Sequence, residues 1–129
     1  RRLVIDKWFS AQAMARRSSI MDDVIELTRH PDFDTGNPNR LRSLVAGFAM
    51  NNPAGFHASD GRGYRFLADQ VIALDSRNPQ LAAGLVSPLG RWKRLKPASQ
   101  QKMRQELQRI MDSGPLSPDV YELVSKSLR

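Results

Sequence analysis

The feature that most constrains the fold of this chain is a helix-start signal that recurs along its length. An Asn or Ser at the N-cap accepts a hydrogen bond from a free backbone N–H of the first helical turn, and a Pro at the next position has no N–H that needs a partner. Each such dipeptide therefore predicts that a helix begins there. Four fit the pattern, namely Asn37-Pro38, Asn52-Pro53, Asn78-Pro79 and Ser117-Pro118, and Asp60 marks a weaker fifth start.

Apolar residues recur at spacings of three and four, which is the period of an amphipathic helix, whereas the alternation typical of strands is nowhere sustained. We therefore expect an all-α fold of roughly seven or eight helices, arranged as an irregular superhelix of antiparallel helix pairs of the ARM, HEAT or TPR solenoid type. The expected buried stripes are Ile5, Trp8, Phe9; Met21, Val24, Ile25; Leu41, Leu44, Val45, Phe48; Tyr64, Leu67, Val71, Leu74; Leu81, Leu85, Leu89, Trp92, with a kink at Pro88; Met103, Leu107, Ile110, Met111; and Val120, Tyr121, Val124, Leu128.

The size and composition fit one domain without covalent cross-links. The chain has 129 residues and no cysteine, which excludes disulfide bonds and cysteine-ligated metals. No apolar run reaches the ~18 residues of a membrane-spanning helix, so we expect no membrane contact. A helical pattern is already present at Leu3–Phe9 without a start signal ahead of it, and we expect residues 1–129 to be a single domain cut from a longer polypeptide.

Few residues in the sequence suggest catalysis. His30 and His57 are the only histidines, whereas a zinc site needs three or four ligands. The sequence has no His-Glu-x-x-His motif, no Gly-x-Ser-x-Gly motif and no cysteine nucleophile. We therefore predict no catalytic residue and no metal ligand in this chain.

The net charge of +7 raises the possibility of an anionic partner. The run "RWKRLK", residues 91–96, places cations around Trp92 and is the best candidate for a nucleic-acid site. However, Trp92 and Leu95 continue an apolar stripe, so the cations fall on the solvated side of their helix. We favour a solvated basic face and expect no nucleic-acid partner; the alternative is a free-standing basic helical module that binds nucleic acid or acidic partners.

Two arginines, Arg40 and Arg42, stand at the front of the otherwise apolar segment "GNPNRLRSLVAGF", residues 36–48. At about 100° per residue they lie on opposite flanks of the apolar stripe. Such arginines usually extend along the edge of a buried face and keep the guanidinium in water, and spacing alone favours this role. The other possibility is that one of them points into a cleft and binds an anionic or carbonyl group.

Three segments resemble the C-terminal helical domain of bacterial aminopeptidase N, a family of zinc metallopeptidases with the gluzincin His-Glu-x-x-His motif. They are "LVIDKWF" (3–9), "NPNRLRSLVAGFAMNNPAGFHASDGRGYRFLADQVIALDSRNPQ" (37–80) and "PLGRWKRLKPASQQKMRQELQRI" (88–110). The resemblance runs along nearly the whole chain and is densest from Asn37 to Gln80. It implies a cytoplasmic bacterial enzyme whose zinc ligands, catalytic glutamate and Gly-Ala-Met-Glu-Asn motif lie in an earlier domain.

The resemblance therefore implies a non-catalytic role for this chain. The domain would close over the catalytic thermolysin-like domain of the same polypeptide, wall the internal cavity and limit access to small peptides. Arg42 would face that cavity and contact the peptide substrate, with Arg40 a weaker candidate, and a second cavity arginine of some relatives would be replaced by Gly84. A third possibility is a peptide-binding solenoid scaffold that is unrelated to peptidases.

Overall fold

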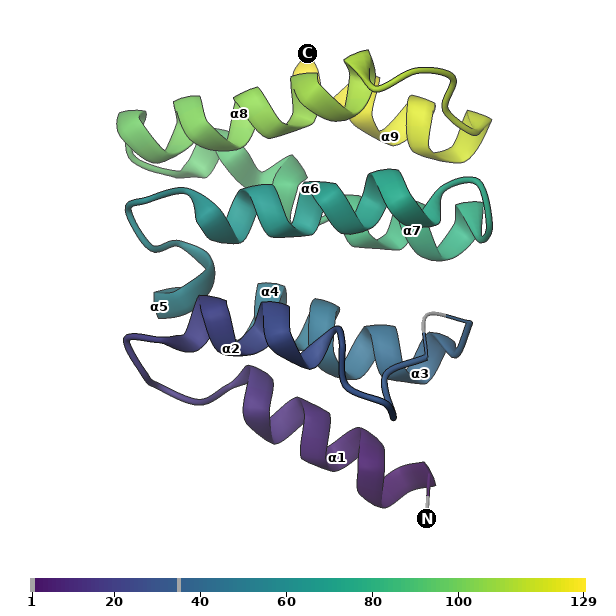
Figure 1. The fold of residues 1–129 in the computed structure, drawn as a ribbon. Helices are drawn as coiled ribbons and strands as arrows, with labels where there is room; N and C mark the ends of the chain where they lie inside the picture. Colours follow the sequence, from purple (N-terminus) through teal and green to yellow (C-terminus); the bar gives the residue numbers. More distant parts are fainter. Residues whose placement is uncertain (1, 35) are drawn as a thin grey trace. The chain divides into compact units, whose positions relative to one another are not determined.

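The structure, a computed structural model, describes residues 2–34 and 36–129, and every regular element in this part of the chain is a helix (Figure 1). The all-α prediction is confirmed. The helices divide into two compact units, Arg1–Ala58 and Ser59–Arg129. None of the helices in the described residues is long and apolar enough to cross a membrane.

The first unit is built from helices that reverse direction along the chain, and Figure 1 shows α1, α2 and the run from α3 to α4 as successive antiparallel pieces. Its elements are α1 (Arg2–Ala13), α2 (Ile20–Leu27), α3 (Pro38–Leu41), the π-helical turn η1 (Arg42–Ala46), α4 (Gly47–Asn51) and the single turn α5 (Pro53–Phe56). The elements α3, η1 and α4 form one continuous helical run over residues 38–51, and α1 packs against this run.

Aromatic side chains occupy the core of the first unit. Phe9 and Phe33 are both buried and meet edge to face with ring centroids 5.8 Å apart. Phe48 and Phe56 form a second edge-to-face pair at 6.2 Å. Such pairs add to the free energy gained by burying apolar area, and the second pair joins the α3–α4 run to α5.

The second unit contains two antiparallel helix pairs, α6 with α7 and α8 with α9 (Figure 1). Its elements are α6 (Arg62–Leu74), α7 (Pro79–Val86), the 3₁₀ helix η2 (Leu89–Arg94), α8 (Pro97–Asp112) and α9 (Pro118–Leu128). The core comes from the apolar stripes expected from the sequence. Their buried residues are Tyr64, Leu67, Val71, Leu74, Leu85, Leu89, Met103, Leu107, Ile110, Val120 and Val124.

The predicted helix starts are confirmed atom by atom. The side chains of Asn37, Asn52, Asn78 and Ser117 each accept a hydrogen bond from a first-turn N–H, at 3.0, 3.1, 3.1 and 3.2 Å respectively. At the weaker start, Asp60 Oδ1 accepts from the Arg62 N–H at 3.0 Å.

Two expected core residues are exposed instead. Trp8 is 42% and Tyr121 is 56% exposed. Each lies next to a fully buried residue, Phe9 and Val120, and the helix presents a buried face too narrow to include both neighbours. The expected kink at Pro88 is a complete break, since α7 ends at Val86 and a 3₁₀ helix follows.

Candidate functional site

Arg40 is held inside the first unit and is only 6% exposed. Its Nη1 forms an ion pair with Asp6 of α1, and its Nε donates a hydrogen bond to the Asp32 carbonyl at 3.1 Å. A buried guanidinium needs such partners because an uncompensated charge in the interior is costly. Through these contacts Arg40 links α3 to α1 and to the connection between α2 and α3, which is a structural role.

Arg42 lies two residues further on and is exposed. Its Nη1 donates to Asn39 Oδ1 at 3.4 Å, a long hydrogen bond between two exposed groups. The Asn39 N–H is in turn bound by the Asn37 side chain that caps α3. The Arg42 guanidinium therefore stands at a defined place near the start of the helix, with most of its donors directed to solvent.

A π-helical turn begins at Arg42. The Gly47 N–H donates to the Arg42 carbonyl, five residues back instead of the four of an α-helix. Such single π turns occur often at functional sites, because the inserted residue re-aims the side chains around it. The turn packs against α1, and a Cβ built on Gly47 would lie at van der Waals distance, 3.8 Å, from the Ala13 Cβ. Periodicity alone does not reveal this turn.

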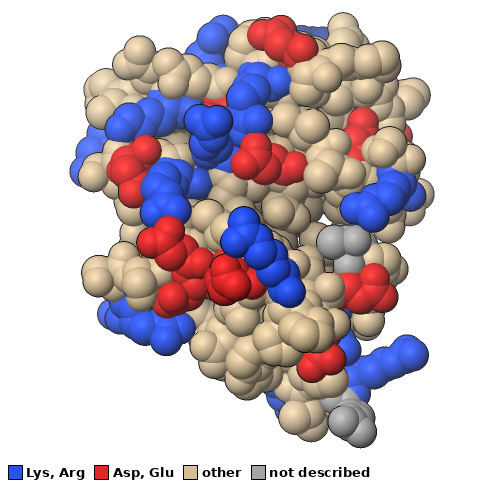
Figure 2. All heavy atoms as spheres, viewed as in Figure 1, with Lys and Arg blue, Asp and Glu red and all other residues tan. Residues whose placement is uncertain are grey.

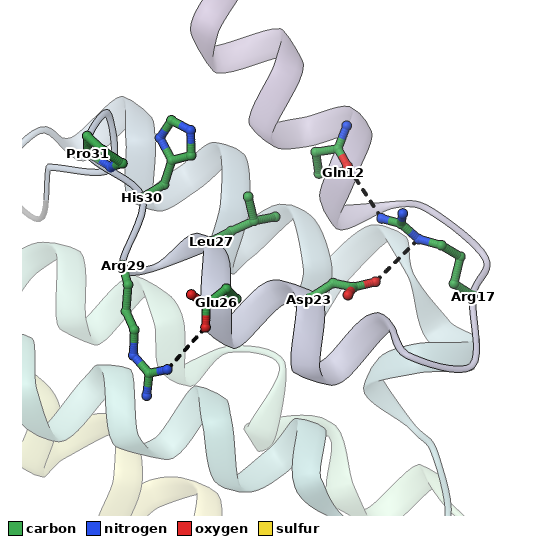
Figure 3. Close-up of a pocket in the computed structure, with 8 residues that line it drawn as sticks. All are labelled: Gln12, Arg17, Asp23, Glu26, Leu27, Arg29, His30 and Pro31. Atoms are coloured by element: carbon green, nitrogen blue, oxygen red, sulfur yellow. Dashed lines mark hydrogen bonds and ion pairs between the residues drawn. The ribbon is translucent and has the colours of Figure 1, made fainter.

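A cavity of about 420 Å³ lies between α1, α2 and the segment after α2. Figure 3 shows Arg17 between Gln12 and Asp23, and Arg29 directed to Glu26. The two ion pairs measure 3.3 Å for Arg17 Nε to Asp23 Oδ2 and 3.2 Å for Arg29 Nη1 to Glu26 Oε2. Because each arginine is neutralised by a carboxylate, the pocket offers no net charge to a ligand.

The two histidines lie in different surroundings. His30 Nδ1 accepts a hydrogen bond from the Asp32 N–H at 3.0 Å, and its ring packs near Trp8 and Phe9. Desolvation lowers the pKa of His57 from its usual 6.5. Among residues 2–34 and 36–129, no three His, Cys, Asp or Glu side chains gather closely enough to hold a metal ion. The described side chains therefore offer no set of three ligands for zinc.

Trp92 lies at the centre of the basic run and is partly buried. Its indole N–H donates to the Ser127 carbonyl of α9 at 2.8 Å. Lys93 Nζ lies 5.6 Å and Arg104 Cζ 5.9 Å from the ring centroid, both as cation–π contacts. This arrangement leaves the ring poorly placed to stack with a nucleic-acid base.

Gly84 lies in α7 on the exposed side of the helix, and a Cβ built there meets no atom within 4 Å. The position therefore has room for a larger side chain.

The sequence analysis did not predict the partners of Arg40, because Asp6 lies far from it in the sequence. An acidic residue inside the first apolar stripe was the signal that could have indicated such a pair.

The fold defines a class, namely an all-helical array, and in its described residues no three His, Cys, Asp or Glu side chains gather to hold a metal ion. Over residues 1–129 the chain matches the family model DUF3458_C, described as a domain of unknown function with ARM repeats. The chain belongs to this family of ARM-repeat domains.

Relatives of the chain are aminopeptidases. It is 51% identical to aminopeptidase N of Caulobacter vibrioides and 46% identical to that of Escherichia coli K12, each over 98% of this chain. It also superimposes on Legionella pneumophila aminopeptidase A, solved in complex with aspartic acid, with a TM-score of 0.91 and 37% identity over 96% of this chain. The chain spans only 14–15% of the length of these proteins. The expected relationship to the C-terminal helical domain of aminopeptidase N is confirmed.

Proposed function

We propose that this chain is the non-catalytic C-terminal domain of a cytoplasmic, zinc-dependent aminopeptidase that removes N-terminal amino acids from peptides. In this proposal the zinc belongs to the thermolysin-like domain of the same polypeptide, and the present chain is one domain of that larger protein. The observation that carries the proposal is the match to aminopeptidases along 98% of this chain but only 14–15% of their length.

In this role the helices cap the catalytic domain and wall the cavity that receives the substrate. A wall of packed helices excludes folded proteins, so only small, unstructured peptides reach the metal.

Arg42 is the residue that we assign to the substrate. Its exposed guanidinium has five donors, of which the structure commits one to a long hydrogen bond with Asn39. A bound peptide carries backbone carbonyls and a terminal carboxylate, which are the acceptors a guanidinium recognises. Arg40 is left out of this assignment because Asp6 and the Asp32 carbonyl already satisfy it.

Steady-state kinetics of the full-length polypeptide that carries this chain test the assignment. Replacing Arg42 by Ala should raise KM for tri- and tetrapeptides about tenfold, the loss expected for one charged hydrogen bond. KM for a chromogenic substrate with a single amino-acid residue should change less than about twofold, because that substrate does not reach Arg42.

Two further variants sharpen this test. Arg42→Lys keeps the charge but loses the planar fork, and it should fall between the wild type and Arg42→Ala. Arg16→Ala removes another exposed cation of the same unit and should leave both KM values unchanged. An equal KM change for long and short substrates would count against the substrate contact.

A further inference from the structure

Positive charge is distributed unevenly between the two units. The second unit holds twelve Lys and Arg residues against seven Asp and Glu, whereas the first holds eight against six. Within the second unit, residues 76–105 contain no Asp or Glu at all. We define the basic segment as the six exposed cations Arg91, Lys93, Arg94, Lys96, Lys102 and Arg104.

The local fold gathers these cations on η2 and the first turns of α8, which pack against each other. Gln100 of α8 donates its side-chain N–H groups to the Lys93 carbonyl at 3.1 Å and to the Leu95 carbonyl at 2.7 Å. The side chains of Arg104 and Lys93 both form cation–π contacts with the Trp92 ring. The two elements are therefore joined, and Lys93 and Arg104 meet at Trp92 where they pack.

The basic segment is not neutralised by neighbouring acids. Within this unit, Arg109 forms ion pairs with Asp69 at 2.7 Å and with Glu106 at 2.8 Å. None of the six cations pairs with a carboxylate in the described part of the chain, and Lys102 donates instead to the Ser59 carbonyl. On the face over α6 and α8, which Figure 2 shows, Lys and Arg lie among Asp and Glu, whereas η2 lies behind this face (Figure 1).

The arrangement indicates which kind of anion suits this surface. A base-stacking role for Trp92 is disfavoured because its ring lies against two cations and its N–H is bound to Ser127. A site for one small phosphate would need cations that converge in a pocket, whereas these six are all exposed. Several separate, exposed cations suit several carboxylates, as in a polypeptide rich in Asp and Glu.

We propose that the basic segment is a docking surface for acidic polypeptide segments. This inference rests on the proposed function for its physiological meaning, since a peptidase that recruits acidic peptides raises their local concentration before cleavage. The binding itself requires no catalysis, because none of the six cations contacts a reacting group in the proposal.

The probe is an N-acetylated octaglutamate peptide with a fluorescent label at its C-terminus. The acetyl group blocks the free amine that an aminopeptidase needs, so binding is measured apart from turnover. With the full-length polypeptide that carries this chain, fluorescence anisotropy should rise to saturation. The affinity should weaken several-fold when NaCl is raised from about 50 to 200 mM, because exposed charges are screened over about 10 Å.

Two variants with equal loss of charge make the test local. The triple change Arg91→Gln/Arg94→Gln/Lys96→Gln leaves both cations on Trp92 and should weaken binding about tenfold. The matched change Arg2→Gln/Lys7→Gln/Arg16→Gln, on α1 and the connection that follows it, should weaken it less than about twofold. Circular dichroism confirms that both remain folded.

Three outcomes would overturn the proposal. They are failure of the peptide to bind, equal weakening by the two triple variants, and tighter binding of a labelled single-stranded octanucleotide at the same salt concentration. If octaglutamate binds as predicted but Arg42→Ala leaves all KM values unchanged, the docking surface stands and the Arg42 assignment fails.

Discussion

The Arg40 guanidinium forms a buried ion pair with Asp6, across 33 intervening residues of the chain. The pair fastens α1 to the helical run that carries Arg42. We expect Arg40→Met to lower the free energy of unfolding by about 3–5 kcal/mol, because it leaves the Asp6 carboxylate without its partner. Urea denaturation, with the midpoint and slope fitted together, measures this loss.

A double-mutant cycle separates the pair from its surroundings. The double variant Asp6→Leu/Arg40→Met should lose less stability than the sum of the two single variants, because no buried charge remains unpaired. Strictly additive losses would contradict a direct interaction between the two side chains.

Asn52 is 4% exposed and makes three hydrogen bonds, one within α5 and two to the end of α1 and the residues just after it. Its Oδ1 accepts from the Gly55 N–H at 3.1 Å, and its amide donates to the Ala13 and Ala15 carbonyls at 2.9 and 3.2 Å. Asn52→Ala should cost about 2–4 kcal/mol of unfolding free energy, since it removes a cap and orphans buried carbonyls.

Asn78 provides the control for Asn52, because its side chain caps α7 through the Leu81 N–H. Asn78→Ala should cost only about 1 kcal/mol, the usual value of a cap. Similar losses at both positions, measured by urea denaturation, would show that the bonds to α1 contribute nothing.

Two glycines in helices should respond oppositely to alanine. Gly84 has open space around a built Cβ, so Gly84→Ala should stabilise the protein by about 0.5–1 kcal/mol through helix propensity. At Gly55 a Cβ would lie 2.9 Å from Phe48 Cε1 and 3.0 Å from Ile20 Cγ2, both in buried side chains. Gly55→Ala should therefore destabilise it by about 1–3 kcal/mol. Thermal unfolding midpoints that shift in the same direction would refute this contrast.

Asp75 is buried at the end of α6 and accepts two hydrogen bonds from Ser117, at 2.7 Å from the N–H and 2.6 Å from the hydroxyl. Asp75→Ala should cost about 2–3 kcal/mol, because bonds to a charged group are stronger than neutral ones. Asp75→Asn keeps the shape and one acceptor oxygen and should cost less. A smaller loss for Asp75→Ala than for Asp75→Asn, in parallel urea titrations, would argue against this account.

Local chemistry made much of the fold predictable. Asn-Pro dipeptides predict helix starts because the Asn side chain and the Pro ring both act on the first turn of the helix. Each of the predicted caps makes its hydrogen bond. The stripe Tyr64, Leu67, Val71 and Leu74 is buried as expected because its spacing follows one face of a single helix. The prediction that Tyr121 is buried was wrong. Periodicity identifies the buried face of a helix but not its width, which depends on the helices packed against it.

The candidate site was less predictable. Periodicity placed Arg40 and Arg42 on equivalent flanks, yet one is buried and the other exposed. The difference comes from Asp6 on another helix and from the π-helical turn at Arg42, and neither follows from local spacing. The role of Arg42 toward a peptide comes from resemblance and stays a prediction.

Under the proposed function, residues 1–129 supply neither the zinc ligands nor the catalytic groups of an aminopeptidase. The most direct measurement compares bound zinc and hydrolysis of an aminoacyl chromogenic substrate for residues 1–129 alone and for the full-length polypeptide, both free of contaminating peptidase. We predict about one zinc and zinc-dependent turnover for the full-length polypeptide, and neither zinc nor turnover for residues 1–129. Zinc-dependent turnover by residues 1–129 alone would contradict the account.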